Sequence, residues 1–458
     1  MTRRAVPAPF VLTVAAALVA LAAADVSAQM RPQPARPYRG LFGGGQPSPD
    51  PNRTRTELTL MAGVTAGYDD NLAGTEGPGS IELADVDQSG YAGLAQIGLT
   101  FFHGKAARSI SADVQANGGY YSTGVNNLLE PGVAASVAAS TTAGRRNTLG
   151  ARYGVSSQPQ FAFGTFAGLA PDVGPEALPT NDPVFGLVDR RTLTWSVGAS
   201  LQRQWSRRDT MGFDYAFNVQ EFTGDVSAGG RNHSTSVRHE RTLSRWASVR
   251  GSYGYRWGRF SDFGGRNRPT REHAFEGGPS FSRRLSATRQ LTMGFQFGAT
   301  YVESERVDDG ELYQYWTPSG GASVALSLGR TWSAGANYSR RLNVLDGLTG
   351  QSYFTDSVTA SLGGLLGRRI SLSLSAGYAD GRTSAASGRD STYSNYTGGV
   401  GVGIALSRHV QAVVDYYYYT YRYSNPGDLP PGFPARYDRN AVRIGISTWI
   451  PLIGTYAR

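Results

Sequence analysis

The sequence has no cysteine and a single lysine, Lys105, so its 44 basic residues are almost all arginine. Without thiols the chain can form no disulfide framework, no cysteine nucleophile and no thiolate metal site. A chain without thiols suits an envelope compartment that holds oxidants. The arginines are spread along the chain and form no basic helix or aromatic-studded module, which argues against nucleic acid as a partner.

Long apolar runs are also missing after residue 28. The one extended run, 10–24, follows Arg3 and Arg4 and ends at Val26-Ser27-Ala28. This order predicts a secretory signal peptide over 1–28; a retained anchor helix is the alternative. If the remaining chain lies in a membrane, it must do so as a closed barrel, because only helices and barrels satisfy their own backbone groups there.

The composition divides the rest of the chain into two parts. Residues 29–55 are rich in Pro, Gly, Gln and Arg, which predicts a disordered periplasmic leader. Residues 56–458 hold most of the 59 glycines and 25 tyrosines and show no helical heptads, which predicts an all-β domain. The formal net charge is +9 and the mean hydropathy is −0.31.

The clearest pattern runs from 191 to 222. Leu193, Trp195 and Val197 alternate with small or polar residues, and after a short turn Met211 and Phe213 begin a second alternating run. Period two over about ten residues is typical of a strand with one face in an apolar medium. The pattern fits both a soluble sheet and a transmembrane barrel whose polar face lines the lumen.

The same pattern recurs along the whole domain. We expect eighteen strands, at about 56–68, 89–102, 109–122, 133–143, 148–158, 191–205, 210–222, 231–243, 247–260, 272–285, 290–304, 315–328, 331–344, 354–366, 370–383, 393–406, 410–424 and 437–450. Short connections alternate with long ones, as in outer-membrane barrels with short periplasmic turns and long extracellular loops. The fold prediction is therefore a transmembrane antiparallel up-and-down β-barrel of about 18 strands. A propeller is the alternative, since a Leu-Ser/Gly-Arg phrase recurs at turns such as 243–245 and 406–408, but propeller blades need four short strands per repeat.

Aromatic residues gather near both ends of the predicted strands, as in the girdles of membrane barrels. Trp205, Trp246 and Trp332 lie beside short turns, whereas Trp257 and Trp316 approach the long loops. Two features fit poorly. Segment 231–243 has no clean apolar face, and the chain ends in WIPLIGTYAR, where the usual barrel assembly signal is weak.

One phrase carries a family resemblance. Gly67-Tyr68-Asp69-Asp70-Asn71-Leu72 closes the first predicted strand, after a signal peptide and a short leader. In this the chain resembles the second β-barrel porin family of Gram-negative outer membranes, over about 56–458. The resemblance implies an outer-membrane barrel, and some relatives look associated with exopolysaccharide export. It supports location and fold more than transport chemistry.

Alternation predicts which ionisable residues face the lumen. Since arginine facing lipid at mid-depth costs about 2–4 kcal/mol, the lumen is favoured for charged residues at these positions. Mixed charges across a pore tune ion selectivity, whereas ion pairs that brace the wall are the alternative role. The lumen and selectivity candidates are Asp113, Asp214, Glu276, Asp415, Arg250, Arg256 and Arg341.

The longest loop, 159–190, is the third on the predicted extracellular side. In general porins, which the layout resembles, the third loop folds into the lumen and narrows it. Phe161, Phe163 and Phe166 would give it an apolar body. Asp172, Glu176 and Asp182 would face arginines on the wall. The alternative is a loop folded over the mouth.

No catalytic, metal or cofactor site emerges from the sequence. Asp69 and Asp70 are a weak cation candidate without EF-hand spacing, and a solvated turn explains them as well. The histidines have no metal-ligand spacing. A Ser-His-Asn phospholipase lacks a motif that marks its nucleophile, so we expect no enzyme and no cofactor.

The sequence therefore predicts a porin-like channel for passive diffusion of small hydrophilic solutes in the bacterial outer membrane. The alternatives are an exopolysaccharide export barrel, in which Tyr417 and Tyr419 would offer stacking surfaces, and a structural or adhesive barrel with a closed lumen. The expected partners are outer-membrane lipid and lipopolysaccharide, the barrel assembly machinery, and small hydrophilic solutes or polysaccharide.

Overall fold

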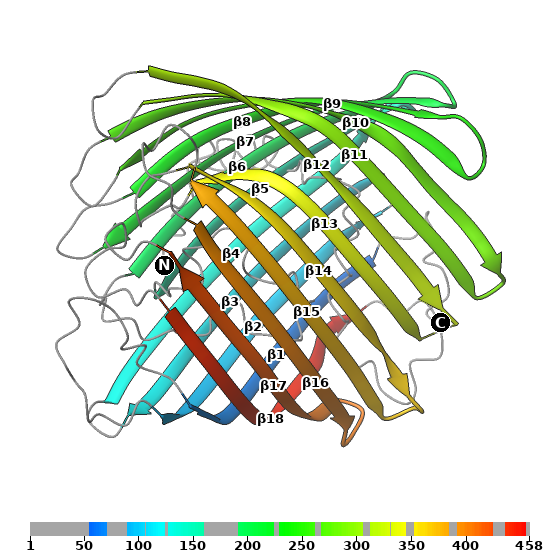
Figure 1. Ribbon diagram of the computed structural model, residues 1–458. Coiled ribbons are helices and arrows are strands. Elements are labelled where there is room, and N and C mark those ends of the chain that lie inside the picture. The colour runs from blue at the N-terminus through cyan, green and yellow to red at the C-terminus, as the bar shows by residue number, and fades with distance from the viewer. Residues whose placement is uncertain are drawn as a thin grey trace, which may run out of the picture.

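Two-residue alternation produces long antiparallel strands throughout the described part of the chain (Figure 1). The computed structural model describes residues 55–70, 89–105, 107–123, 127–159, 191–223, 229–261, 267–305, 312–329, 331–344, 352–383, 392–424 and 436–454. No helix in these ranges is long and apolar enough to cross a membrane. The predicted signal peptide and all of the leader except Arg55 lie outside the described residues.

The eighteen predicted strands are confirmed. Their bounds are β1 Arg55–Asp69, β2 Gly90–Lys105, β3 Arg108–Thr123, β4 Asn127–Ala143, β5 Asn147–Pro159, β6 Arg191–Gln204, β7 Asp209–Thr223, β8 Gly229–Thr242, β9 Ala247–Ser261, β10 Asn267–Ser286, β11 Arg289–Glu305, β12 Leu312–Leu328, β13 Trp332–Val344, β14 Ser352–Leu366, β15 Ile370–Thr383, β16 Thr392–Ala405, β17 Val410–Tyr423 and β18 Arg436–Gly454.

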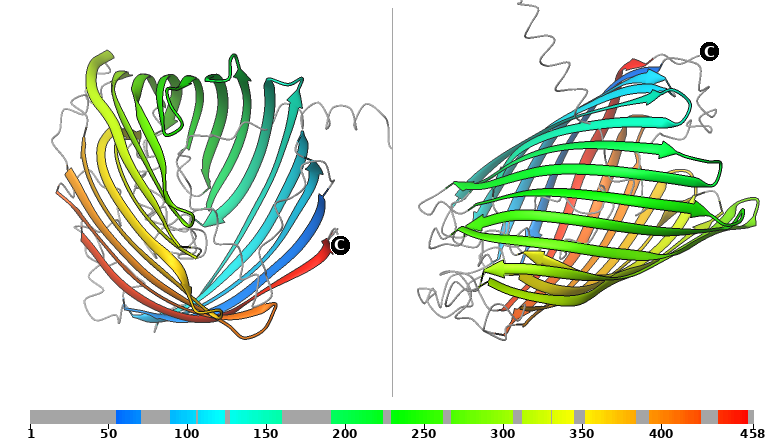
Figure 2. Two further views of the ribbon diagram at one scale, coloured as in Figure 1. Left: turned by 90° about the vertical axis from the view of Figure 1, so that its right-hand side faces the viewer. Right: turned by 90° about the horizontal axis from the view of Figure 1, so that it is seen from above.

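The sheet closes on itself. Each strand pairs antiparallel with the next along the chain, and β1 pairs with β18 from Glu57 opposite Gly454 to Asp69 opposite Ala441. Figure 2 shows the tilted strands wrapping around a common axis. Every described strand therefore has two hydrogen-bonded neighbours, which excludes the propeller alternative.

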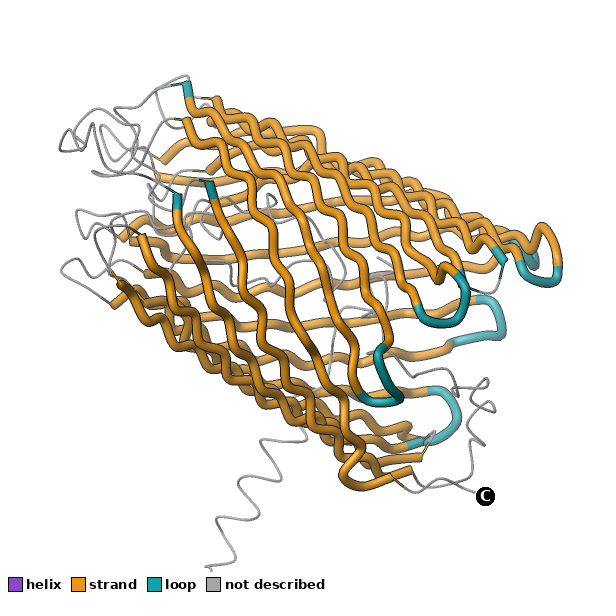
Figure 3. The backbone as a smooth tube through the Cα atoms, turned by 90° about the horizontal axis from the view of Figure 1, so that it is seen from below, coloured by secondary structure: helices purple, strands orange, loops and turns teal. Residues whose placement is uncertain are grey.

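The two ends of the barrel differ. All eight connections at one end are turns of two to four residues, from 106–107 to 406–409. The nine connections at the other end include 70–89 and 160–190, and the first residue of β1 and the last of β18 lie at the short-turn end. Figure 3 shows the short turns gathered at one end of the tube. Gly144 and Gly367, in three-residue turns, have φ of 71° and 72°, a backbone region that glycine enters without strain.

Several strands extend further than predicted, and three of them do so through an internal proline. Pro131 in β4, Pro269 in β10 and Pro451 in β18 lie where one neighbouring strand has no paired residue: β5 pairs with β4 only from Val133 onward. A proline removes a hydrogen-bond donor, so it is tolerated where that side of the strand has no ladder. The expected ranges 133–143, 272–285 and 437–450 leave these prolines outside, whereas the strands include them.

The strand faces separate by polarity. Large apolar side chains on alternate residues are exposed on the outer face, among them Phe297, Trp316 and Ile444, which are 68%, 63% and 60% exposed. The residues between them are small or polar and face inward, as Asp214 does beside the outward Phe213. The outer surface is thus the apolar surface of the molecule, the reverse of a soluble sheet.

β8 is a strand even though its sequence lacks an apolar face. His233 lies on its outward face between the rings of Phe217 and Trp257, with centroid distances of 4.5 and 5.3 Å. The His233 ring nitrogen Nδ1 is 2.8 Å from the Tyr215 hydroxyl. Aromatic rings on the neighbouring strands therefore supply the apolar cover that β8 does not carry itself.

Closure predicts a specific gel behaviour. A fully hydrogen-bonded barrel keeps its shape in detergent until heated, so unboiled protein should migrate differently from boiled protein on a detergent gel. Identical mobility before and after boiling would contradict a closed barrel.

Candidate functional site

One sector of the inner wall carries closely spaced charges of both signs. The Arg238 guanidinium on β8 donates to the Asp214 carboxylate on β7 at 2.7 Å. Arg256 on β9 lies 3.3 Å from the Glu272 carboxylate on β10. Charged side chains pair here across adjacent strands, where alternation brings both to the inward face.

In the same sector, two further sets of inward residues lie opposite one another on neighbouring strands. Glu240 on β8 lies directly opposite Arg250 on β9, and Glu240 also accepts a hydrogen bond from Ser248 at 2.8 Å. Arg238 and Glu276 flank Ser252 on its two sides. We call the seven charged residues of β7 to β10 the charged wall: Asp214, Arg238, Glu240, Arg250, Arg256, Glu272 and Glu276.

A second inward cluster lies at the seam where β1 meets β18. The Arg439 Nε donates to the Asp69 carboxylate at 2.6 Å, its Nη2 also binds that carboxylate, and both side chains are almost fully buried. Arg443 donates to the Tyr417 hydroxyl, and the guanidinium carbon atoms of Arg439 and Arg443 lie 5.5 and 4.9 Å from the Tyr417 ring centre. The seam therefore joins strands 370 residues apart through an ion pair as well as backbone hydrogen bonds.

The structure places all seven lumen candidates on the inward face. Asp214, Glu276, Arg250 and Arg256 belong to the charged wall. Asp113 on β3 accepts a hydrogen bond from Thr100 at 2.7 Å, and Asp415 on β17 lies opposite Arg443. Arg341 is on β13, one residue from the outward Arg340. Their role in selectivity stays a prediction.

Sequence reasoning missed Arg238, Glu240 and Glu272, which complete the charged wall. Arg238 and Glu240 were overlooked because the alternation in 231–243 is weak, although the strong pattern of β7 fixes their register. Arg439 and Arg443 were missed too. Both alternate on β18 with the outward Val442 and Ile444, so the alternation within that strand alone would have found them.

The remaining predicted positions give a mixed result. The predicted constriction-loop residues, Phe161 to Asp182, lie outside the described residues. Asp69 is bound by Arg439, and Asp70 accepts hydrogen bonds from the backbone and side chain of Asn440, each at 2.6 Å. Within the described ranges, no group of three or more His, Asp or Glu residues could hold a metal ion.

Tyr417 and Tyr419 do face inward, but each is only 4% exposed. Tyr393, Tyr421 and Tyr423 on the same inner face are also buried. Rings with so little exposed surface present no open face for a polymer, so they do not support the polysaccharide alternative.

One group of ionisable residues on the outer face is paired near the long-loop end. Arg271 is 3.5 Å from Glu303, which also accepts hydrogen bonds from Tyr301 at 3.2 Å and Gln314 at 3.3 Å. With Trp257 nearby, they form an aromatic and polar band. Such bands mark the height at which a barrel wall leaves hydrocarbon.

Comparisons with known proteins give structural likenesses only. No family model matches the chain, and no curated protein matches it, so the resemblance to the β-barrel porin family stays a prediction. Among solved structures, OpdL of Pseudomonas aeruginosa is 12% identical with a TM-score of 0.40, over 87% of this chain and 99% of that one.

Two further structures give the same picture. OccK7 (OpdD) of Pseudomonas aeruginosa is 10% identical with a TM-score of 0.43, over 88% of this chain and 100% of that one. OccAB2 of Acinetobacter baumannii is 10% identical with a TM-score of 0.41, over 87% and 98%. Likenesses this low carry no argument about the function of this chain.

The seam predicts a stability difference between two aspartates. Asp69→Asn leaves the buried Arg439 without its carboxylate, and removing one partner of a buried pair costs about 3–5 kcal/mol. Asp356→Asn is the control: its partner Arg340 is 3.4 Å away and both side chains are more than a third exposed, so the loss is at most about 1 kcal/mol. The measurement is the urea midpoint of unfolding in detergent. Equal midpoints for the two variants would show that the seam pair does not stabilise the barrel.

Proposed function

We propose that this chain is a bacterial outer-membrane channel through which small hydrophilic solutes diffuse passively. The observation that carries the proposal is the closed sheet of eighteen strands with an apolar outer face and an inner face bearing the charged wall. Barrels of 16 to 18 strands enclose an aqueous lumen, whereas smaller barrels fill theirs with side chains.

The charges support a watery interior. Arg256 and Glu276 lie along the middle of their strands, where a lipid-facing arginine costs about 2–4 kcal/mol. On the inward face they are solvated and can act on permeating ions. Charges of both signs on one side of a pore orient polar solutes and set ion selectivity.

The proposed location follows from the same faces. An apolar outer band bordered by aromatic residues fits a membrane, and the predicted signal peptide would deliver the chain to the periplasm. Outer-membrane lipid, lipopolysaccharide and the barrel assembly machinery are then its partners. The short turns face the periplasm and the long loops face the outside.

Planar-bilayer recording of the refolded 29–458 chain tests the proposal. We expect stable conductance steps with a measurable reversal potential in a salt gradient. Exchanging positive for negative charge in Arg250→Glu/Arg256→Glu should shift that potential toward cation selectivity, because both guanidinium groups face the lumen.

A matched variant distinguishes the effect of arginines in the lumen from that of an arginine on the outer surface. Arg259→Glu changes an exposed arginine on the outward face of β9, beside Trp257, and should leave the reversal potential unchanged. Arg250→Gln/Arg256→Gln serves if the charge reversal prevents folding, which the gel mobility reveals. Silence from correctly folded protein would overturn the channel proposal.

A further inference from the structure

The short-turn end of the barrel is ringed by exposed arginines. They lie in or beside turns around the circumference, and we call six of them the arginine rim: Arg145, Arg207, Arg245, Arg289, Arg369 and Arg408. The Leu-Ser/Gly-Arg phrase that repeats in the sequence accounts for two of these positions, Arg245 and Arg408. The channel proposal makes no use of this repeated charge.

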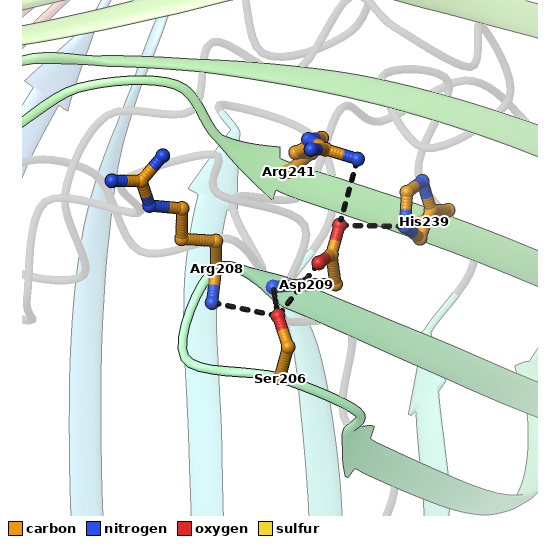
Figure 4. Close-up of polar contacts among 5 residues, drawn as sticks. All are labelled: Ser206, Arg208, Asp209, His239 and Arg241. Carbon is orange, nitrogen blue, oxygen red and sulfur yellow. Dashed lines mark hydrogen bonds and ion pairs between the residues drawn. The ribbon is translucent and has the colours of Figure 1, made fainter.

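Few carboxylates offset the rim. Within four residues of the short turns, the described carboxylates are Asp209 and Glu240. Asp209 is already engaged: it accepts a hydrogen bond from Ser206 at 2.6 Å and lies 3.6 Å from His239 and 3.8 Å from Arg241 (Figure 4). The Arg208 side chain reaches away from this group (Figure 4). Glu240 faces inward, opposite Arg250. The rim therefore has a large excess of positive charge.

Among the described residues, the opposite end of the barrel has no such excess. Carboxylates accompany the arginines there: Arg436 lies 2.8 Å from Asp438, and Arg382 lies 3.7 Å from Asp380. Asp70 adds a further carboxylate at that end. The two rims thus differ in charge as well as in loop length.

Exposed apolar side chains accompany the rim arginines. Leu243 and Leu406 each precede an arginine of the rim by two residues and are 53% and 58% exposed. Trp205 likewise precedes Arg207 by two residues. The Arg203 guanidinium lies 4.3 Å from the centre of the Trp205 ring. These three turns thus place an exposed apolar side chain two residues before an exposed arginine. Phospholipids offer that order of groups, acyl chain and then phosphate.

We propose that the arginine rim binds the phosphate groups of anionic phospholipids in the leaflet on the short-turn side. Guanidinium groups bind phosphate oxygens in pairs through parallel N–H donors, and the neighbouring leucine and tryptophan side chains contact the acyl chains. The apolar contacts favour a lipid over a water-soluble acidic polymer, which would meet only the charge. The inference rests on the proposed membrane location but not on an open lumen.

Spin-labelled lipids test this in vesicles that contain the folded full-length barrel. The fraction of motionally restricted label is measured for phosphatidylglycerol and for phosphatidylcholine. We expect the wild type to prefer phosphatidylglycerol about three-fold or more, and 1 M salt to reduce the preference.

Two variants locate the preference. Arg207→Gln/Arg245→Gln/Arg369→Gln/Arg408→Gln should bring the ratio close to one. The control Arg231→Gln/Arg259→Gln/Arg382→Gln/Arg422→Gln removes four exposed arginines near the long-loop end and should keep the wild-type ratio. Gel mobility before boiling shows that each variant is folded.

The proposal is overturned if the wild type binds both lipids equally or if the rim variant keeps the preference. Equal lipid binding together with retention on purified peptidoglycan would assign the rim to the cell-wall polymer instead. A silent channel with a normal lipid preference would remove the proposed function and leave this inference standing. An open channel with no preference for phosphatidylglycerol would remove this inference and leave the proposed function standing.

Discussion

Backbone hydrogen bonding in an apolar medium is the constraint on which this structure depends. A strand in hydrocarbon must bond every N–H and C=O group to another strand, because no water is present to bond the groups of a free edge. The pairing of β1 with β18 removes the last two edges. The Asp69–Arg439 ion pair lies at the same seam, where the earliest and latest parts of the described chain meet.

Closure also fixes what each side chain meets. Once the sheet forms a ring, every strand has one face toward its surroundings and one toward the axis, and a single alternation in sequence settles both. Apolar side chains such as Phe297 and Ile444 lie on the outer face. Charged pairs such as Arg256–Glu272 and Arg238–Asp214 lie on the inner face. On the outer face, Arg271 and Glu303 lie near a rim and are paired with each other.

The strand count could be predicted from sequence because period two is a local signal that each strand carries for itself. The strand ends at Pro131, Pro269 and Pro451 could not, since whether a proline is tolerated depends on where the neighbouring strand ends. Alternation also gave the inward side of the site. It did not give the partners: Arg439 reaches Asp69 only because the barrel closes, and no local pattern reports that contact.

The two ends of the barrel differ in loop length and in the charge of their described residues. Short turns of two to four residues leave no room for folded loops, so their side chains lie close to the strand ends. Long connections lie at the other end, where arginines such as Arg382 and Arg436 are accompanied by carboxylates. Arginine thus occurs in three settings: facing the lumen in the charged wall, buried against a carboxylate at the seam, and exposed beside an apolar side chain at the arginine rim.

The central claim, a watery inner face and a lipid-covered outer face, can be tested directly because the chain has no cysteine of its own. Ser252→Cys introduces a thiol on the inward face of β9, and Ala299→Cys introduces one on the outward face of β11, opposite Phe275. With each protein in lipid vesicles, a charged, membrane-impermeant thiol reagent should modify the Ser252→Cys protein and spare the Ala299→Cys protein. Modification of the Ala299→Cys protein alone, or of both at the same rate, would contradict the account.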